Sequence, residues 1–263
     1  MDNQISEARS GVVSGVLPCG YLDSNGELQA DFVVDELDGY DEDALAGSGP
    51  VLTRLNKVIA RRLQKIGAIE EKPQVVKVVQ SLLALDRMMI LLAIRRATHG
   101  DIFRMNARCP AEGCGEEFRS SVDLSQLDMT PMDNPKEREF EHTLCRGTVV
   151  KWRVMVGSDE EWLTSTRKDK RMKADQFTLA FFARVTHVNG EEIVRSGAPG
   201  LVDKSRKLLK SMKSSERNEL RNVFMRHEGN IDTELEFSCP SCGQEWKGEL
   251  DVGQPDFFFP AEE

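Results

Sequence analysis

The sequence predicts an α+β protein made of two copies of one unit, in which each copy combines a β-hairpin, several helices and a hairpin that carries two cysteines. Three observations support this prediction. Apolar residues recur with the spacing of helices in some segments and of strands in others. A series of short motifs in the first half recurs in the same order in the second half. Each half also ends in a closely spaced cysteine pair, and the two pairs together predict one four-cysteine zinc site of the ribbon type.

The composition is that of an ordinary soluble globular protein. Of the 263 residues, 40% are hydrophobic and 30% are charged, which is enough for one large or two small folded domains. The net charge of −9 gives an acidic surface that repels phosphate backbones, so nucleic acid is disfavoured as a main partner. The dense basic run 167–173 alternates with acids, and we interpret it as a solvated helix face.

Neither a membrane span nor a secretory signal is expected. The longest apolar run, residues 88–94, is much shorter than the segment needed to cross a bilayer. Residues 1–10 are polar and acidic, whereas a secretory signal is basic and then apolar. We therefore expect a reducing compartment, in which cysteine pairs more often bind metal than form disulfides.

The first copy is expected over residues 17–127, after a flexible N-terminal arm of residues 1–16. Its Asn25-Gly26 pair favours a tight turn between two strands. The acids that follow Gly39 favour the start of a short helix, because they face the positive end of the helix dipole. Three further helices are predicted from apolar spacing, over residues 50–66, 73–83 and 86–98, the last of them ended by Gly100.

The second copy is expected over residues 138–254, after a proline-containing linker of residues 128–137. It repeats the Gly-x-Asp-Glu pattern of Gly39 at Gly157. It also repeats the acid–arginine pair, as Glu216-Arg217 for Asp86-Arg87, and the run of residues that follows the last cysteine of each half. Because these matches keep their order and nearly their spacing, we infer an internal duplication. A single α+β domain with recurring local patterns is the alternative.

Four cysteines have the spacing of two metal-binding knuckles, namely Cys109, Cys114, Cys239 and Cys242. Two cysteines separated by two to four residues can place both sulfurs on one ion, and four thiolates complete a tetrahedron. The glycine after each pair, Gly115 or Gly243, suits a backbone that turns tightly with positive φ.

These knuckles predict one structural Zn²⁺ that joins the two copies. Protein sulfur would fill all four positions of the tetrahedron, which leaves no place for an activated water. The ion would also close a long loop, which contributes about 4–5 kcal/mol by analogy with a cross-link. The alternatives are an unmetallated turn and a redox dithiol, although redox dithiols normally lie at strand-to-helix junctions rather than at hairpin tips.

The sequence has none of the common catalytic or cofactor-binding motifs. It lacks a phosphate-binding loop, a dinucleotide-binding fingerprint and a nucleophile elbow. We therefore expect no enzymatic activity, no catalytic residue and no small-molecule substrate. The C-terminal tail, residues 255–263, is a second candidate site because it contains Phe257, Phe258 and Phe259 in succession. These rings either cover the core of the second copy or bind a partner protein.

Several short motifs occur together in this chain, namely Leu17-Pro18-Cys19-Gly20-Tyr21, the segment 86–100, the Cys109/Cys114 knuckle, the Gly157-x-Asp-Glu start, Val188-Asn189-Gly190 and the phenylalanine-rich end. In these motifs the chain resembles tail and baseplate proteins of T-even-type contractile phages. Members of that family usually have serine where this chain has Cys19. The resemblance implies a non-enzymatic component or assembly factor of the baseplate hub or tail, with other phage tail and baseplate proteins as partners. It also implies that the protein is in the bacterial host cytoplasm during assembly, with the virion tail or baseplate as a second location.

Two other classes of function stay open at this point. A zinc-ribbon nucleic-acid-binding or transcription accessory protein would bind nucleic acid with an affinity that falls steeply with salt. An enzyme would lose its activity when one carboxylate is substituted, but the sequence nominates no such carboxylate.

Overall fold

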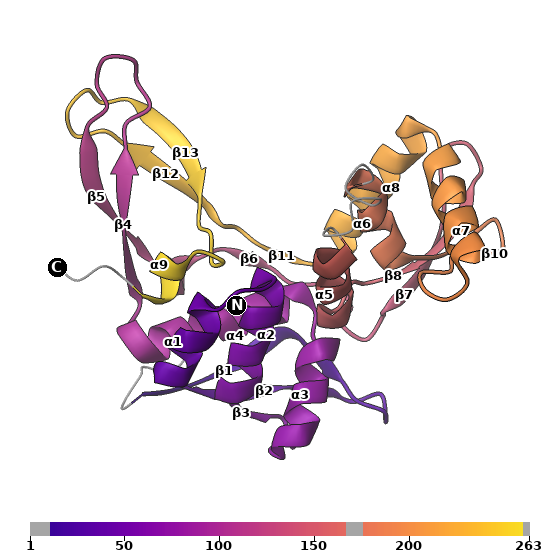
Figure 1. Cartoon of the computed structure of the whole chain (residues 1–263), viewed down its shortest axis with the longest axis horizontal. Coiled ribbons are helices and arrows are strands. Elements are labelled where there is room, and N and C mark those ends of the chain that lie inside the picture. Colours follow the sequence, from indigo (N-terminus) through magenta and orange to yellow (C-terminus); the bar gives the residue numbers. More distant parts are fainter. Residues whose placement is uncertain (1–10, 167–175, 260–263) are drawn as a thin grey trace.

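The computed structural model describes residues 11–166 and 176–259, which form two modules of helices and strands and a projecting arm (Figure 1). We call residues 12–100 the first module, residues 139–227 the second module, and the two hairpins at 102–123 and 234–249 the arm. Buried apolar residues of both modules belong to one continuous core. The basic run 167–173, expected on a helix face, lies outside the described residues.

The first module contains a three-stranded antiparallel sheet in the order β1-β2-β3. Its strands are β1 (Val12–Leu22), β2 (Leu28–Asp35) and β3 (Leu63–Ile66). The predicted turn between β1 and β2 is present, and Gly26 has a φ of +79° there. Strand β1 begins at Val12, so residues 12–16 belong to the sheet and not to the N-terminal arm predicted for residues 1–16.

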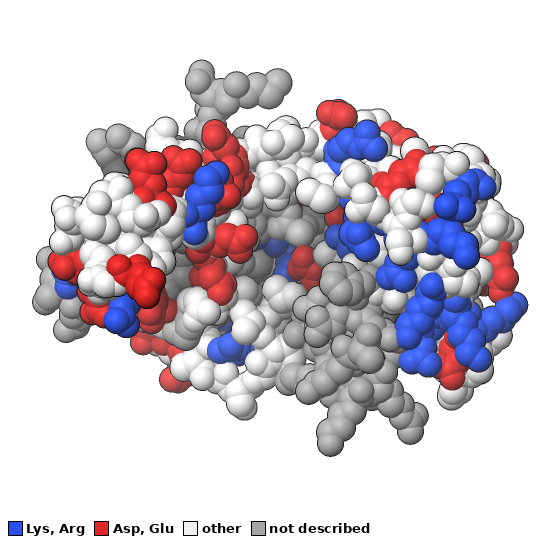
Figure 2. Space-filling model, turned by 90° about the horizontal axis from the view of Figure 1, so that it is seen from above, with Lys and Arg blue, Asp and Glu red and all other residues white. Residues whose placement is uncertain are grey.

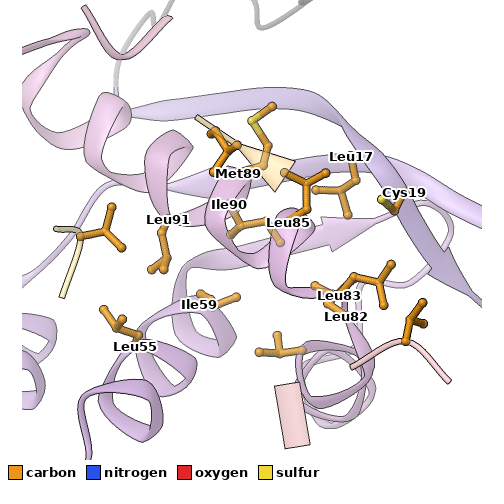
Figure 3. Packing of buried hydrophobic residues seen from close by; sticks show 14 of the residues in the cluster. Leu17, Cys19, Leu55, Ile59, Leu82, Leu83, Leu85, Met89, Ile90 and Leu91 are labelled. Carbon is orange, nitrogen blue, oxygen red and sulfur yellow. The ribbon is translucent and has the colours of Figure 1, made fainter. Parts of the chain in front are cut away.

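Four helices pack with this sheet, namely α1 (Gly39–Ala46), α2 (Val51–Arg62), α3 (Lys72–Ser81) and α4 (Ala84–His99). Helix α4 is buried along most of its length, and Figure 3 shows its Met89 and Leu85 close to Leu17 of β1. Gly100, with a φ of +78°, ends α4 as predicted. The helix predicted over residues 50–66 ends at Arg62 instead. Leu63 and Ile66 are both fully buried in β3, and their spacing of three residues also fits a helix, so the apolar pattern could not distinguish the two.

The second module has the same order of elements as the first. Its strands are β7 (Glu139–Thr143), β8 (Val149–Arg153), β9 (Val185–Val188) and the short β10 (Glu191–Glu192), in the sheet order β10-β9-β8-β7. Its helices are α5 (Gly157–Thr166), α6 (Gln176–Arg184), α7 (Pro199–Ser211) and α8 (Ser214–His227). In both modules a hairpin is followed by two helices, a strand that pairs with the hairpin, and two more helices.

A buried aspartate lies in the first turn of the first helix of each module. Asp41 accepts a hydrogen bond from the Asp38 N–H at 3.1 Å, and Asp159 accepts one from the Val156 N–H at 3.0 Å, in each case from three residues earlier. Each carboxylate also pairs with two arginines. These are Arg61 at 3.0 Å and Arg62 at 2.7 Å for Asp41, and Arg153 at 2.7 Å and Arg195 at 2.5 Å for Asp159. The shared Gly-x-Asp-Glu pattern therefore corresponds to one shared arrangement, a carboxylate that caps its helix and neutralises two cations.

A second contact recurs between the second and fourth helices of each module. Arg87 Nε donates to Asn56 Oδ1 at 2.9 Å in the first module, and Arg217 Nη2 donates to Thr178 Oγ1 at 3.2 Å in the second. Asn56 and Thr178 each stand seven residues before the first residue of the strand that follows their helix.

The two modules contact each other where α5 meets α2 and α3. The Gly157 N–H donates to the Leu82 carbonyl at 3.0 Å, and Leu83 forms a β-bridge with Val156. Arg87, which is 3% exposed, also pairs with Glu160 of α5. The buried arginine of the first module therefore spans the boundary between the modules.

The arm is made of two hairpins from distant parts of the chain that lie side by side (Figure 1). They are β4 (Ile102–Arg108) with β5 (Glu117–Asp123), and β12 (Glu234–Ser238) with β13 (Glu245–Glu249). Between arm and second module, β6 (Met129–Thr130) pairs with β11 (Asn230–Ile231), so the predicted linker 128–137 contains a short strand. Helices α9 (Pro255–Phe258) and η1 (Leu124–Gln126) complete the described elements, and none of the described helices could cross a membrane.

Candidate metal centre

Each hairpin of the arm ends in one of the two cysteine knuckles. In the first, the Cys109 N–H donates to the Glu116 carbonyl at 2.8 Å, and in the second the Cys239 N–H donates to the Gln244 carbonyl at 2.9 Å. Gly115 and Gly243 have φ values of +62° and +71°, as their positions after the second cysteine predicted. A β-carbon is disfavoured in that region, so glycine lets the chain turn back into the hairpin.

The four predicted cysteines come together at the tip of the arm. All four Sγ atoms lie within 4.8 Å of one another. Two of the contacts cross between the hairpins, with 3.6 Å between the Sγ atoms of Cys109 and Cys242 and 3.8 Å between those of Cys114 and Cys239. A tetrahedral ion with metal–sulfur bonds of about 2.3 Å requires sulfur–sulfur separations of about 3.8 Å. The residues present therefore fit a tetrahedral metal ion without rearrangement of the hairpins.

The electrostatics of the knuckles also favour a cation. Burial raises the pKa of Cys239, but hydrogen bonds from the backbone N–H groups of Cys242 and Ser241 outweigh it and lower this pKa to about 7. The pKa of Cys109 is raised to about 12, first by burial and then by the neighbouring thiols, against a backbone N–H from Ala111. Backbone donors stabilise thiolates here, but four thiolates so close together cannot all ionise unless a cation neutralises them.

Aromatic side chains hold the two hairpins together below the knuckles. Phe237 and Trp246 lie opposite each other in their hairpin, with ring centroids 5.4 Å apart. The edge of Trp246 meets Phe118 of the other hairpin at 5.9 Å. Along each hairpin these half-buried residues alternate with exposed polar ones. The two hairpins thus pack face to face, which brings the cysteines of the two halves into range of one ion.

The phenylalanine tail packs against the first module and not the second copy. Phe257 and Phe258 are each 1% exposed, and Phe259 is partly buried against the same core. The Phe257 ring lies 5.3 Å from that of Phe103 in β4. Arg95 Nε donates to the Phe257 carbonyl at 2.8 Å, and His99 Nε2 lies 2.9 Å from the Phe258 carbonyl. For Phe257 and Phe258 to bind a partner protein, the tail would first have to leave this site.

Sequence reasoning did not identify Arg95 and His99 as the residues that hold the tail. The one signal available was their separation of four residues near the end of a helix, which places both side chains on one face of that helix. Arg95 also lines a cavity of about 670 Å³ at the base of the arm, together with Arg119 and Asp251.

The fold and the site define a two-module α+β protein whose halves meet at four cysteines that could hold one metal ion. The sequence model of the family described as T4 bacteriophage base plate protein matches residues 64–259, which is 196 of the 263 residues. The chain belongs to this family, as its resemblance to T-even-type baseplate proteins predicted. No curated protein and no solved structure gave a significant match.

Proposed function

We propose that this protein is a non-enzymatic structural or assembly protein of a contractile phage tail, acting in the hub region of the baseplate or in the tail. Its partners would be other tail and baseplate proteins. Membership of the T4 base plate family supports this proposal, together with an arm whose design is that of a scaffold. The arm consists of two packed hairpins and four close cysteines, which would fill all four positions around a bound metal ion.

The proposed ligand of the four cysteines is one structural Zn²⁺. Four thiolates in a tetrahedron are a preferred environment for zinc, which would supply a fixed link between the hairpins and no chemistry on a substrate. The observation that best supports this role is that the ligands come from both halves of the chain: Cys109 and Cys114 from one half, and Cys239 and Cys242 from the other. Loss of the ion should therefore separate the halves at the arm, not merely loosen one loop.

A matched pair of variants tests this role. Cys239→Ser removes one ligand, whereas Cys145→Ser changes an exposed cysteine outside the site. We expect elemental analysis to find about one zinc per chain in the wild type and in Cys145→Ser, and much less in Cys239→Ser. Only Cys239→Ser should show faster amide exchange in both hairpins. Wild-type protein purified without chelators that holds no zinc, or that holds iron instead, would contradict the proposal.

We further infer that the two modules arose by internal duplication. The shared order of elements and the recurrence of the Asp41 and Arg87 contacts at Asp159 and Arg217 support this inference. An experimental structure in which the modules superpose with Asp41 on Asp159 and Asn56 on Thr178 is the expected result. Modules with different strand order would contradict it.

Mass spectrometry of purified particles and of partial tails tests the location. A component should be present in both, whereas an assembly factor should be present in partial tails and absent from finished particles. The protein's absence from both, together with nucleic-acid binding that weakens steeply with salt, would favour the alternative of a zinc-ribbon accessory protein.

A further inference from the structure

One end of the second module carries an excess of positive charge. Residues 199–227 contain eight Lys and Arg against three Asp and Glu, a net charge of +5 in a chain whose total is −9. Figure 2 shows Lys and Arg gathered at this end of the molecule. We define the basic face by its exposed cations, Lys204, Lys207, Lys210, Lys213 and Arg221.

Part of this charge is neutralised within the chain, since Lys204 pairs with Glu191 at 2.5 Å and Arg206 with Asp203 at 2.8 Å, but three cations of the basic face have no carboxylate partner among the described residues. Glu216, one of the three acids, is 3% exposed, and another, Glu219, accepts the Cys145 N–H. Within the part of the chain that the structure describes, no carboxylate pairs with Lys207, Lys213 or Arg221. Arg221 instead faces the Phe181 ring at 5.7 Å.

The opposite end of the molecule carries a complementary acidic surface. Residues 230–256 contain seven Asp and Glu against one lysine, a net charge of −6. We define the acidic face as the exposed outer side of the β12–β13 hairpin, formed by Glu234, Glu236, Glu245, Lys247 and Glu249.

The arrangement of the acidic face is unfavourable in an isolated chain. Glu234 lies directly opposite Glu249 in the hairpin, and like charges in that position destabilise a strand pair. Lys247 is the one cation on the face, and its Nζ lies 2.5 Å from Glu234 and 4.0 Å from Glu236. The inner side of the hairpin packs on the rest of the arm, while the outer side is exposed.

We propose that the basic face of one copy of this protein docks on the acidic face of a second copy. The two faces lie at opposite ends of the molecule (Figure 1), so they cannot meet within one chain. Their lengths agree: a 13-residue helix such as α7 is about 20 Å long, and a five-residue strand such as β12 is about 17 Å long. A head-to-tail contact of this kind repeats from copy to copy and generates a ring or an open chain.

The charges predict how this contact should behave. Exposed ion pairs are individually weak, and salt screens such pairs over about 8–10 Å at physiological ionic strength. The contact should therefore be weak and salt-sensitive, and its main effect should be to steer and orient the encounter of two copies. It uses neither the cysteines nor the phenylalanine tail, so it can hold or fail independently of the proposed zinc and baseplate roles.

Sedimentation of the full-length protein with reversed charges tests the proposal. Variant A carries Lys207→Glu and Lys213→Glu, and variant B carries Glu236→Lys and Glu245→Lys. In wild type, we expect mass to increase with concentration at about 20 mM salt and to return to the monomer at about 300 mM. Each variant alone should associate much less than wild type at low salt, because the basic face falls from +5 to +1 in variant A and the acidic face changes from −3 to +1 in variant B. An equimolar mixture of A and B should associate again, because the unchanged acidic face of A can meet the unchanged basic face of B.

A control variant carries two reversals elsewhere, Asp133→Lys and Glu137→Lys, at exposed positions outside both faces. It should associate like wild type, and thermal unfolding should show that all variants are folded. Wild type that stays monomeric at low salt would overturn the proposal. So would variants A and B that each associate alone as much as wild type does, or a mixture that stays monomeric while wild type associates. Binding of polyglutamate or duplex DNA to the basic face without self-association would also overturn it, in favour of another acidic partner.

Discussion

The starts of α1 and α5 share a sequence pattern but differ in what surrounds them. At both, a buried aspartate caps the helix and pairs with two arginines. A β-carbon on Gly39 at the start of α1 would meet open space, whereas one on Gly157 at the start of α5 would lie 2.8 Å from the Val79 carbonyl. The same pattern thus serves as a cap in both modules and as an interface in only one. A local motif determines the capping, and the tertiary arrangement decides what packs on it.

Arg87 and Arg217, which make corresponding contacts in the two modules, also differ in what surrounds them. Arg87 is buried and reaches Glu160 of the other module, whereas Arg217 stays within its own module and faces the Phe181 ring at 4.9 Å. Burial, followed by the charge of Arg221, lowers the pKa of Arg217. One arginine therefore joins the modules, and the other lies beside the exposed cations of α8.

The largest effect on stability is expected from the tail, which packs on the first module and not on the second. Phe258→Ala would leave a cavity beside Leu45 and Leu55, and such truncations of a buried aromatic ring cost about 3–5 kcal/mol. Hydrogen exchange should accelerate in α2, α4 and the base of the arm, while α7 and α8 keep their wild-type rates. Equal acceleration in both modules would contradict the view that the tail seals one of them.

The arginine comparison predicts the next largest effect. Arg87→Ala removes the partner of Asn56 and Glu160 in a buried setting and should cost about 3 kcal/mol, since breaking a buried ion pair leaves the remaining charge uncompensated. Arg217→Ala removes a half-buried contact to Thr178 and should cost about 1 kcal/mol. Urea unfolding of both variants measures the difference. Similar losses would show that Arg87 does not bridge the modules.

The modules should also respond differently to acid. Burial raises the pKa of Asp86 in the first module to about 6, against hydrogen bonds from the N–H groups of Cys19 and Gly20 and the charge of Arg138. Since this folded-state pKa lies above the unfolded value of about 3.9, the stability it contributes is fully present below pH 4 and is lost as the pH rises through 6. The contribution is about 2–3 kcal/mol.

The pKa of Asp159 in the second module is shifted in the opposite direction. Burial would raise its pKa, but hydrogen bonds from Arg153, the Val156 N–H and Arg195 outweigh burial and hold the pKa below its usual value. Its stabilisation is therefore present above about pH 4 and is lost as the pH falls through the folded-state pKa. Hydrogen exchange at pH 7 and pH 5 should show the first module gaining protection at the lower pH. Asp86→Asn should abolish that gain, and a gain that persists in this variant would rule out Asp86 as its cause.

The smallest effect comes from the two glycines. Gly157→Ala forces the Val79 carbonyl or Arg87 to move and should cost about 1–2 kcal/mol. Gly39→Ala meets no neighbour and should be neutral or slightly stabilising, because alanine favours a helix more than glycine does. Thermal unfolding distinguishes them. A neutral Gly157→Ala would mean that α5 does not pack closely on α3.

The local signals in the sequence predicted more of this protein than the long-range ones. The turn at Gly26 and the end of α4 at Gly100 each depend on a few adjacent residues, and each was predicted correctly. The four knuckle cysteines lie within 4.8 Å of one another, and the zinc that they are predicted to hold stays a prediction. The strand β3 was mistaken for helix because Leu63 and Ile66, both buried, lie three residues apart and so continue the helical spacing of the preceding residues. Only pairing with β2 decides between them.

Features that need the tertiary structure could not be predicted. The tail was expected either to cover the core of the second copy or to bind a partner protein, yet it packs on the first module through Arg95 and His99, which lie about 160 residues away along the chain. The basic face was not identified either, because lysines spaced along α7 are ordinary for an exposed helix. The gathering of Lys and Arg at one end of the molecule is seen only in the structure (Figure 2).

The central claim is that one metal ion, held by cysteines from both halves, closes the arm. X-ray absorption at the zinc edge, on full-length protein of known zinc content, tests this most directly. We expect about one zinc per chain, with four sulfur neighbours at about 2.3 Å and no nitrogen or oxygen neighbour. A site with two sulfurs and lighter ligands would mean that each knuckle acts alone, and it would contradict the claim.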